Sequence, residues 1–199
     1  MATGTVDVGS MQNVTDGGQG EAAANPVTKG ASDLASRETP LLREEWYVAA
    51  LSSEITRTPM RRTVCEQDIV FYRDAGGKAV ALQNRCAHRS YPLSNGQVNG
   101  DRIVCGYHGM EFGPDGRCAR IPAQANIPAA MRVQAYPIIE QGPFIWIWTG
   151  RPDAPDMSKF VEQPWFTDAG WANVHGYMYM RASYLGLHEN LMDLSLIHI

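Results

Sequence analysis

The sequence predicts a mainly β fold made of antiparallel hairpins. Short runs of β-branched and aromatic residues recur between residues 41 and 150, and turns rich in Gly and Asp separate them. Before about residue 183, no run shows the 3.6-residue apolar period of a helix. The chain has 199 residues, 44% of them hydrophobic, which is enough for one good core and the start of a second.

Three parts are expected along the chain. Residues 1–40 are rich in Gly, Ala, Ser, Thr and Asn. With so few large apolar side chains they cannot bury enough surface to offset the entropy of ordering, so we expect a disordered tail. Residues 41–150 hold the hairpins and form the first domain. Residues 151–193 begin with a Pro-rich linker and continue into the start of a second domain.

Individual elements of the first domain follow from local patterns. The runs 69–72 and 79–82 flank a Gly-Gly turn, which predicts a hairpin. The segment 112–117 contains Gly-Pro-Asp-Gly and predicts a second tight turn. Every residue of 144–148 is large and apolar, so this strand is expected to be buried on both faces, with its two tryptophans in the core.

Two elements are expected after the linker. Residues 174–180 alternate between two sets of side chains with the two-residue period of a strand. A helix is expected from about Ser183, because apolar residues then recur at intervals of three or four. On such a helix Asn190 and Asp193 share one face.

Charge and cysteine content exclude several classes of protein. The net charge of −4 gives no basic footprint for nucleic acid, and no apolar stretch approaches the length of a membrane span. The four cysteines do not form a disulfide framework and no secretory signal is visible, so we expect a reducing cytoplasm. Cys65 and Cys118 are expected to be buried structural thiols.

The chemistry is concentrated in two short segments. Cys86 and His88 form a C-x-H motif, and Cys105 and His108 form a C-x-x-H motif after a gap of sixteen residues. Each motif follows a short β-prone run, so both should lie on loops at strand ends, where two loops can hold one cofactor between them. Two thiolates and two imidazoles make a metal site the first hypothesis.

The mixed ligand pairs favour one cofactor. In a Rieske [2Fe-2S] centre two His replace two of the usual four Cys on one iron. Cys86 and Cys105 would then hold one iron, and His88 and His108 the other. A structural zinc also accepts two Cys and two His, but its usual spacing pairs Cys with Cys and His with His. A zinc-held interaction module therefore stays open as an alternative, and it would be colourless where an iron-sulfur protein is brown.

The residues beside these ligands indicate a low reduction potential. High-potential Rieske proteins of respiratory complexes carry an additional Cys in each loop and a Ser that donates toward the cluster sulfurs. Here Tyr91, Tyr107 and Met110 occupy those places. Fewer donors stabilise the reduced cluster less, so the potential is expected in the lower part of the Rieske range.

These motifs and their surroundings resemble the Rieske domain of bacterial aromatic-ring oxygenases. The chain is most similar to the oxygenase components of the vanillate O-demethylase and dicamba monooxygenase group. The likeness covers about residues 41–193, and these segments carry it: 45–50, 86–94, 103–112, 116–118, 121–122, 144–150 and 189–193.

The resemblance implies a fold and an activity. Residues 41–150 would be the Rieske domain, and residues 151–193 the first elements of an α+β catalytic domain of the helix-grip type. An NAD(P)H-dependent reductase with flavin and a plant-type [2Fe-2S] cluster would supply electrons. In the intact protein a mononuclear Fe(II) would then activate O2 for monooxygenation of a small aromatic substrate, such as O-demethylation, with ring dihydroxylation as the nearby alternative. A homotrimer is also implied.

The resemblance also gives Asp193 a role. This residue matches the Asp of the family's D-x-x-H-x-x-x-x-H run, which bridges electron transfer between neighbouring subunits; a solvated or capping carboxylate is the alternative. Leu196 stands where the first iron-binding His is expected. Residues 194–199 match the translation of a common transposase-type sequencing adapter, so we expect this end to be non-native. Taken literally, the 199 residues also fit a free-standing Rieske ferredoxin-type carrier, although such a carrier does not need the chain beyond Gly150.

Overall fold

A computed structural model describes residues 41–174, 178–182 and 184–192. Residues 41–180 belong to one compact unit, and the helix α2 (Tyr184–Met192) is not part of that unit. The predicted tail 1–40, Asp193 and the predicted non-native end 194–199 lie outside the described residues. No helix in the described ranges is both long enough and apolar enough to cross a bilayer.

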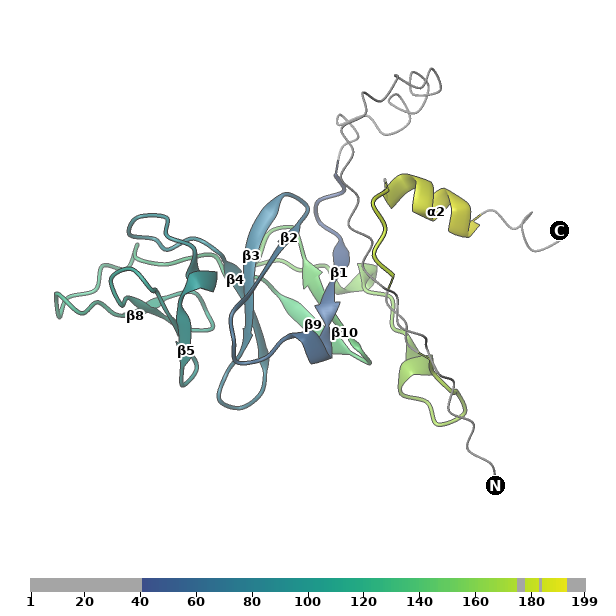
Figure 1. The fold of residues 1–199 in the computed structure, drawn as a ribbon, viewed down its shortest axis with the longest axis horizontal. Helices are drawn as coiled ribbons and strands as arrows, with labels where there is room; N and C mark the ends of the chain where they lie inside the picture. Colours follow the sequence, from purple (N-terminus) through teal and green to yellow (C-terminus); the bar gives the residue numbers. More distant parts are fainter. Residues whose placement is uncertain (1–40, 175–177, 183, 193–199) are drawn as a thin grey trace, which may run out of the picture. The chain divides into compact units, whose positions relative to one another are not determined.

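Three small antiparallel sheets make up the unit (Figure 1). The first sheet has the order β1-β10-β9, the second β2-β3-β4, and the third β5-β6-β7-β8. Short 3-10 turns connect some of the strands. The strands are β1 (Trp46–Leu51), β2 (Met60–Val64), β3 (Gln67–Arg73), β4 (Ala79–Gln83), β5 (Gln97–Asn99), β6 (Arg102–Val104), β7 (Glu111–Phe112), β8 (Cys118–Arg120), β9 (Ile138–Gln141) and β10 (Phe144–Trp148).

The middle sheet has a core on each of its faces. On β3, Val70 and Tyr72 pack into a core shared with the third sheet, while Ile69 and Phe71 pack into a core shared with the first. All four side chains are 0% exposed. A strand covered on both faces has no polar face, which explains the continuous apolar run at 69–72. The predicted hairpin is confirmed, because β3 pairs antiparallel with β4.

The other local predictions for this unit are largely confirmed. β7 and β8 form the hairpin around the predicted turn at 112–117, where the Gly113 N–H donates to the Arg117 carbonyl at 2.9 Å. In β10, Trp148 is buried, and Trp146 is half-buried. The ring of Phe160 lies edge-on to Trp146, with ring centroids 5.5 Å apart. The segment after Gly150 therefore returns to cover this sheet, and the predicted domain boundary at residue 150 stays a prediction.

The prediction for residues 174–180 is wrong where the structure describes them. Val174 and residues 178–180 belong to no strand, and Val174 is 97% exposed and Met178 81% exposed. Residues 175–177 lie outside the described part. An alternating pattern predicts a strand only if a neighbouring strand supplies hydrogen bonds, and none of the ten described strands pairs with this segment. The helix predicted from about residue 183 is confirmed as α2.

Candidate metal centre

The four predicted donor residues lie on two loops of one unit. Cys86 and His88 follow β4, and Cys105 and His108 lie between β6 and β7. Both loops border the core that is shared by the second and third sheets, because Cys86 and Cys105 are members of that core. The fold therefore brings together two motifs that are separated by sixteen residues in the sequence.

The two loops repeat one pattern of backbone hydrogen bonds. The N–H of Cys86 donates to the carbonyl of the residue five positions later at 2.9 Å, and the N–H of Cys105 does so at 2.8 Å. Each cysteine carbonyl also accepts from the N–H four positions later, in Ser90 and Gly109. Both of these residues have positive φ, +58° and +67°. A left-handed residue at this point turns the chain back, which leaves the preceding imidazole at the tip of each loop.

Thiols and imidazoles differ in their exposure. Cys86 is 3% exposed and Cys105 is 2% exposed, whereas His88 and His108 are exposed. Burial raises the pKa of Cys86 to about 11, although the backbone N–H groups of His88 and Arg89 donate to its sulfur and oppose the shift. The thiols are thus held inside the core, and bound metal would take the place of their protons.

The imidazoles are positioned to share one metal ion. Nδ1 of His88 lies 3.2 Å from Nδ1 of His108. For a metal–nitrogen bond of about 2.1 Å, as for imidazole on zinc, a tetrahedral angle places two nitrogens about 3.4 Å apart. The observed separation agrees with this value, so both imidazoles can bind the same ion through Nδ1.

The arrangement fits a dinuclear cluster better than a single zinc ion. In the part of the chain that the structure describes, no three side chains of His, Cys, Asp or Glu converge as they would around one metal ion. The imidazoles face each other at the surface while the thiols lie in the core. In a Rieske cluster one iron is held by two thiolates and the other by two imidazoles, which agrees with this separation of the cysteine pair from the histidine pair.

One tyrosine ring stacks on His108, and a second tyrosine lies beside the first. Tyr107 is 53% exposed, and its ring lies 3.8 Å from that of His108, with an angle of 31° between the planes. Tyr91 follows at 5.6 Å from Tyr107. The sequence places both tyrosines beside the ligands, but only the structure shows that Tyr107 stacks on His108. This contact restricts the rotation of the His108 ring and shields one of its faces from water.

A buried carboxylate supports the second loop. Glu111 follows the loop on β7 and is 6% exposed. Arg102 on β6 donates to it at 3.2 Å, and Arg120 on β8 donates at 3.0 Å. Burial alone raises the pKa of Glu111, but the two guanidinium groups outweigh burial and hold the pKa below its usual value. The sequence pattern does not predict that Glu111 is buried, because a solvent-exposed glutamate could occupy the same position in it.

Replacing Glu111 by Gln is expected to lower the free energy of unfolding at pH 7 by about 1–3 kcal/mol, because two charge-assisted hydrogen bonds are lost. A carboxylate whose pKa is lower in the folded state stabilises that state fully at pH values above its pKa in the unfolded chain, about 4.3. This stabilisation is lost as the pH falls through the pKa of the folded state. Urea unfolding at several pH values should therefore show that wild type and variant converge in acid.

Asp153→Asn is the matched control, because Asp153 pairs with Arg151 while 73% exposed. It should leave the free energy of unfolding close to that of wild type, because solvent screens an exposed ion pair. If Glu111→Gln lowers the free energy of unfolding by the same amount at pH 7 and in acid, the two ion pairs of Glu111 do not stabilise the fold.

The remaining cysteines and Asp193 differ in how far the structure supports their predicted places. Cys118 is buried in the same core as Cys86 and Cys105, as predicted, whereas Cys65 is only half-buried. All four cysteines are free thiols. Asp193, the proposed electron-transfer bridge, lies outside the described residues.

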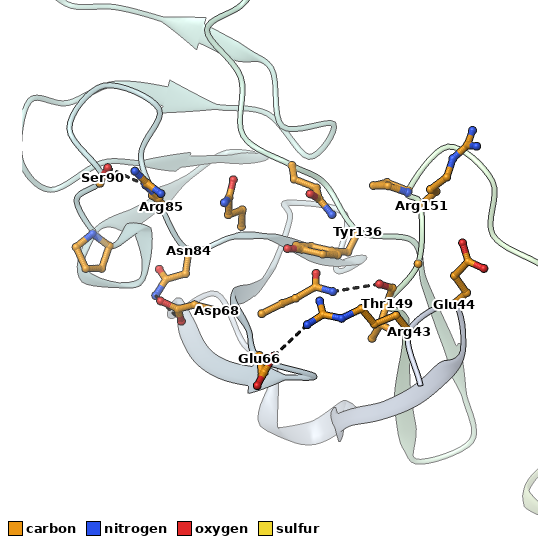
Figure 2. Close-up of a pocket in the computed structure, with 16 residues that line it drawn as sticks. Arg43, Glu44, Glu66, Asp68, Asn84, Arg85, Ser90, Tyr136, Thr149 and Arg151 are labelled. Atoms are coloured by element: carbon orange, nitrogen blue, oxygen red, sulfur yellow. Dashed lines mark hydrogen bonds and ion pairs between the residues drawn. The ribbon is translucent and has the colours of Figure 1, made fainter. Parts of the chain in front are cut away.

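A cavity of about 770 Å³ lies elsewhere in the unit and contains none of the four donors (Figure 2). Its lining carries charges of both signs, and Arg43 pairs with Glu66 at 3.0 Å across one end. At the other end Arg85 points to Ser90 (Figure 2). The candidate metal centre is therefore located by its four donor residues, and the 770 Å³ cavity is not part of it.

Comparison with known proteins gives a consistent result. The family model of the Rieske [2Fe-2S] domain matches residues 45–137. The iron-sulfur subunit of the toluene-4-sulfonate monooxygenase system of Comamonas testosteroni is 39% identical over 153 residues, which are 76% of this chain and 44% of that protein. The oxygenase component of dicamba O-demethylase from Stenotrophomonas maltophilia is 36% identical over 154 residues, which are 77% of this chain and 45% of that protein.

Solved structures agree with the sequence relatives. Dicamba monooxygenase with non-heme iron and dicamba superposes with a TM-score of 0.73 and 35% identity, over 78% of this chain and 48% of that chain. The chain thus spans less than half the length of these relatives. The matched length of 153 residues also exceeds the Rieske model itself, so the likeness continues beyond the cluster domain. The chain carries a Rieske [2Fe-2S] domain, and over about three quarters of its length it is similar to the iron-sulfur and oxygenase components of monooxygenase and O-demethylase systems.

Proposed function

We propose that this chain is the electron-accepting portion of an aromatic-compound oxygenase, with a [2Fe-2S] cluster held by four residues. Cys86 and Cys105 would hold one iron, and His88 and His108 the other. When bound, such a cluster accepts and releases one electron at a time. The observation that carries the proposal is the 3.2 Å separation of the two Nδ1 atoms, on loops whose two cysteines are buried.

The residues around the donors have distinct tasks in this proposal. Buried Cys86 and Cys105 keep the sulfur side away from water, and the N–H groups of His88 and Arg89 donate to Cys86 and stabilise negative charge on its sulfur. Exposed His88 and His108 form the edge at which another protein surface can approach. Electrons would therefore enter or leave close to the imidazoles.

The activity of the whole protein is proposed by similarity to its relatives. Their names describe the iron-sulfur subunit of a monooxygenase system and the oxygenase component of an O-demethylase. We propose a flavin and iron-sulfur reductase as electron donor, a small aromatic substrate, and a mononuclear Fe(II) for O2 activation in the intact protein. Asp193 would connect the cluster of one subunit to the iron of the next in a homotrimer, in a catalytic domain that begins after about residue 150. The expected compartment is the cytoplasm.

Metal and sulfide analysis of anaerobically purified protein tests the cofactor. We expect two irons and two inorganic sulfides per chain, a brown colour, and a Rieske electron paramagnetic resonance signal after reduction. The midpoint potential should fall in the lower half of the Rieske range of about −150 to +300 mV. Colourless protein that contains zinc and no sulfide would show that the site is a zinc centre.

A further inference from the structure

Five of the arginines that the structure describes have no carboxylate partner, and two of these, Arg85 and Arg132, lie together beside the first loop. Most arginine side chains have a carboxylate partner: Arg43, Arg61, Arg62, Arg73, Arg102, Arg117, Arg120 and Arg151. Arg85, Arg89 and Arg132 have none among the described residues, and all three are exposed. The chain as a whole has a net charge of −4, so this positive charge is local.

Arg85 and Arg132 line the same hollow of about 300 Å³, and Cys86 lines it too. No acidic side chain contributes to this hollow. Its other lining residues are Gln83, Ala87, Ser90 and Ala130. Uncompensated positive charge thus lies directly beside a residue proposed to bind the cluster.

Backbone hydrogen bonds hold the two arginines in place. The Gln83 N–H donates to the Gln134 carbonyl at 2.8 Å and joins the end of β4 to the segment that carries Arg132. That segment is also bound to the β7–β8 hairpin, because the Val133 N–H donates to the Gly116 carbonyl at 2.8 Å. Nε of Arg85 donates to the Ser90 hydroxyl at 2.7 Å (Figure 2). A preorganised guanidinium loses little entropy on binding a carboxylate.

We propose that Arg85 and Arg132, here called the arginine face, dock the acidic surface of the protein that reduces the cluster. This inference rests on the proposed function. Guanidinium groups bind carboxylates through paired hydrogen bonds, and a local patch of one sign raises the association rate with a partner of the other sign. The net charge of −4 disfavours the polyanionic phosphates of a nucleic acid as the alternative partner.

Stopped-flow reduction of the cluster by a reduced plant-type [2Fe-2S] ferredoxin tests the arginine face. One electron leaves the ferredoxin cluster and enters the Rieske cluster, which is favourable because plant-type clusters lie near about −400 mV. Arg85→Glu and Arg132→Glu should each lower the second-order rate constant about fivefold or more at low ionic strength. The difference from wild type should disappear as salt increases.

Arg57→Glu is the matched control. Arg57 is also exposed and has no carboxylate partner among the described residues, but it binds the Gly100 carbonyl in the β5–β6 turn, at the far end of β6 from Cys105. It should leave the rate within about twofold of wild type. Photoreduced 5-deazariboflavin, an uncharged donor, should reduce all variants at the wild-type rate.

The outcomes separate docking from cluster binding. A wild-type chain without iron and sulfide overturns the proposed function, and the docking inference with it. Variants that keep the Rieske signal and react with ferredoxin as fast as wild type overturn the arginine face alone. Variants that react more slowly with 5-deazariboflavin as well also overturn it, because the substitution then acts on the cluster and not on docking.

Discussion

Replacing His88 or His108 by Ala is expected to abolish the Rieske spectrum and to remove most of the iron. Their Nδ1 atoms are 3.2 Å apart and would bind the same ion, so the loss of one leaves that iron with a single imidazole and an open position to water. Cys86 and Cys105 would hold the other iron, so they cannot replace the missing ligand of the iron at the histidines. Visible absorption, iron and sulfide content, and electron paramagnetic resonance of the purified variants measure this loss directly.

His188→Ala on α2 is the matched control, since it makes the same substitution at an exposed histidine outside the centre. It should keep the full spectrum and iron content. The ligand variants should still fold, because the core between the first and middle sheets contains neither loop. Circular dichroism checks this. An intact Rieske signal in His88→Ala or His108→Ala would disprove the ligand assignment.

Gly116→Ala is expected to lower the free energy of unfolding by about 2–4 kcal/mol. Gly116 lies in the β7–β8 turn with φ +77°, a conformation that L side chains rarely adopt. An added Cβ would also overlap the carbonyl oxygen of Val133. Because this clash is with backbone, the segment beside the hairpin must shift. Thermal unfolding should show a midpoint lower by roughly 4–16 °C.

Gly77→Ala separates the two causes. Gly77 has a similar φ of +82°, but an added Cβ there meets no atom within 4 Å. Its cost should be limited to backbone conformation, about 1 kcal/mol. If both variants lose the same stability, the close approach of Val133 to Gly116 has no energetic importance.

Much of the fold could be predicted because its signals are local. The hairpin of β3 and β4 follows from two apolar runs and a Gly-Gly turn, and the turn at 112–117 follows from its glycines and proline. The strand expected at 174–180 did not form in its described residues, because side-chain alternation describes one strand and says nothing about its partner. Pairing depends on a second segment, which the local pattern does not contain.

The sequence by itself predicted the donor set, since two thiols and two imidazoles in mixed pairs at these spacings favour a Rieske cluster over a zinc site. Only the tertiary structure decided that the two Nδ1 atoms meet at 3.2 Å, that both cysteines are buried, and that Glu111 lies between two arginines. These features depend on contacts between the two loops and among neighbouring strands. Spacing along the chain fixes which groups are available, whereas packing fixes their distances, burial and charge environment.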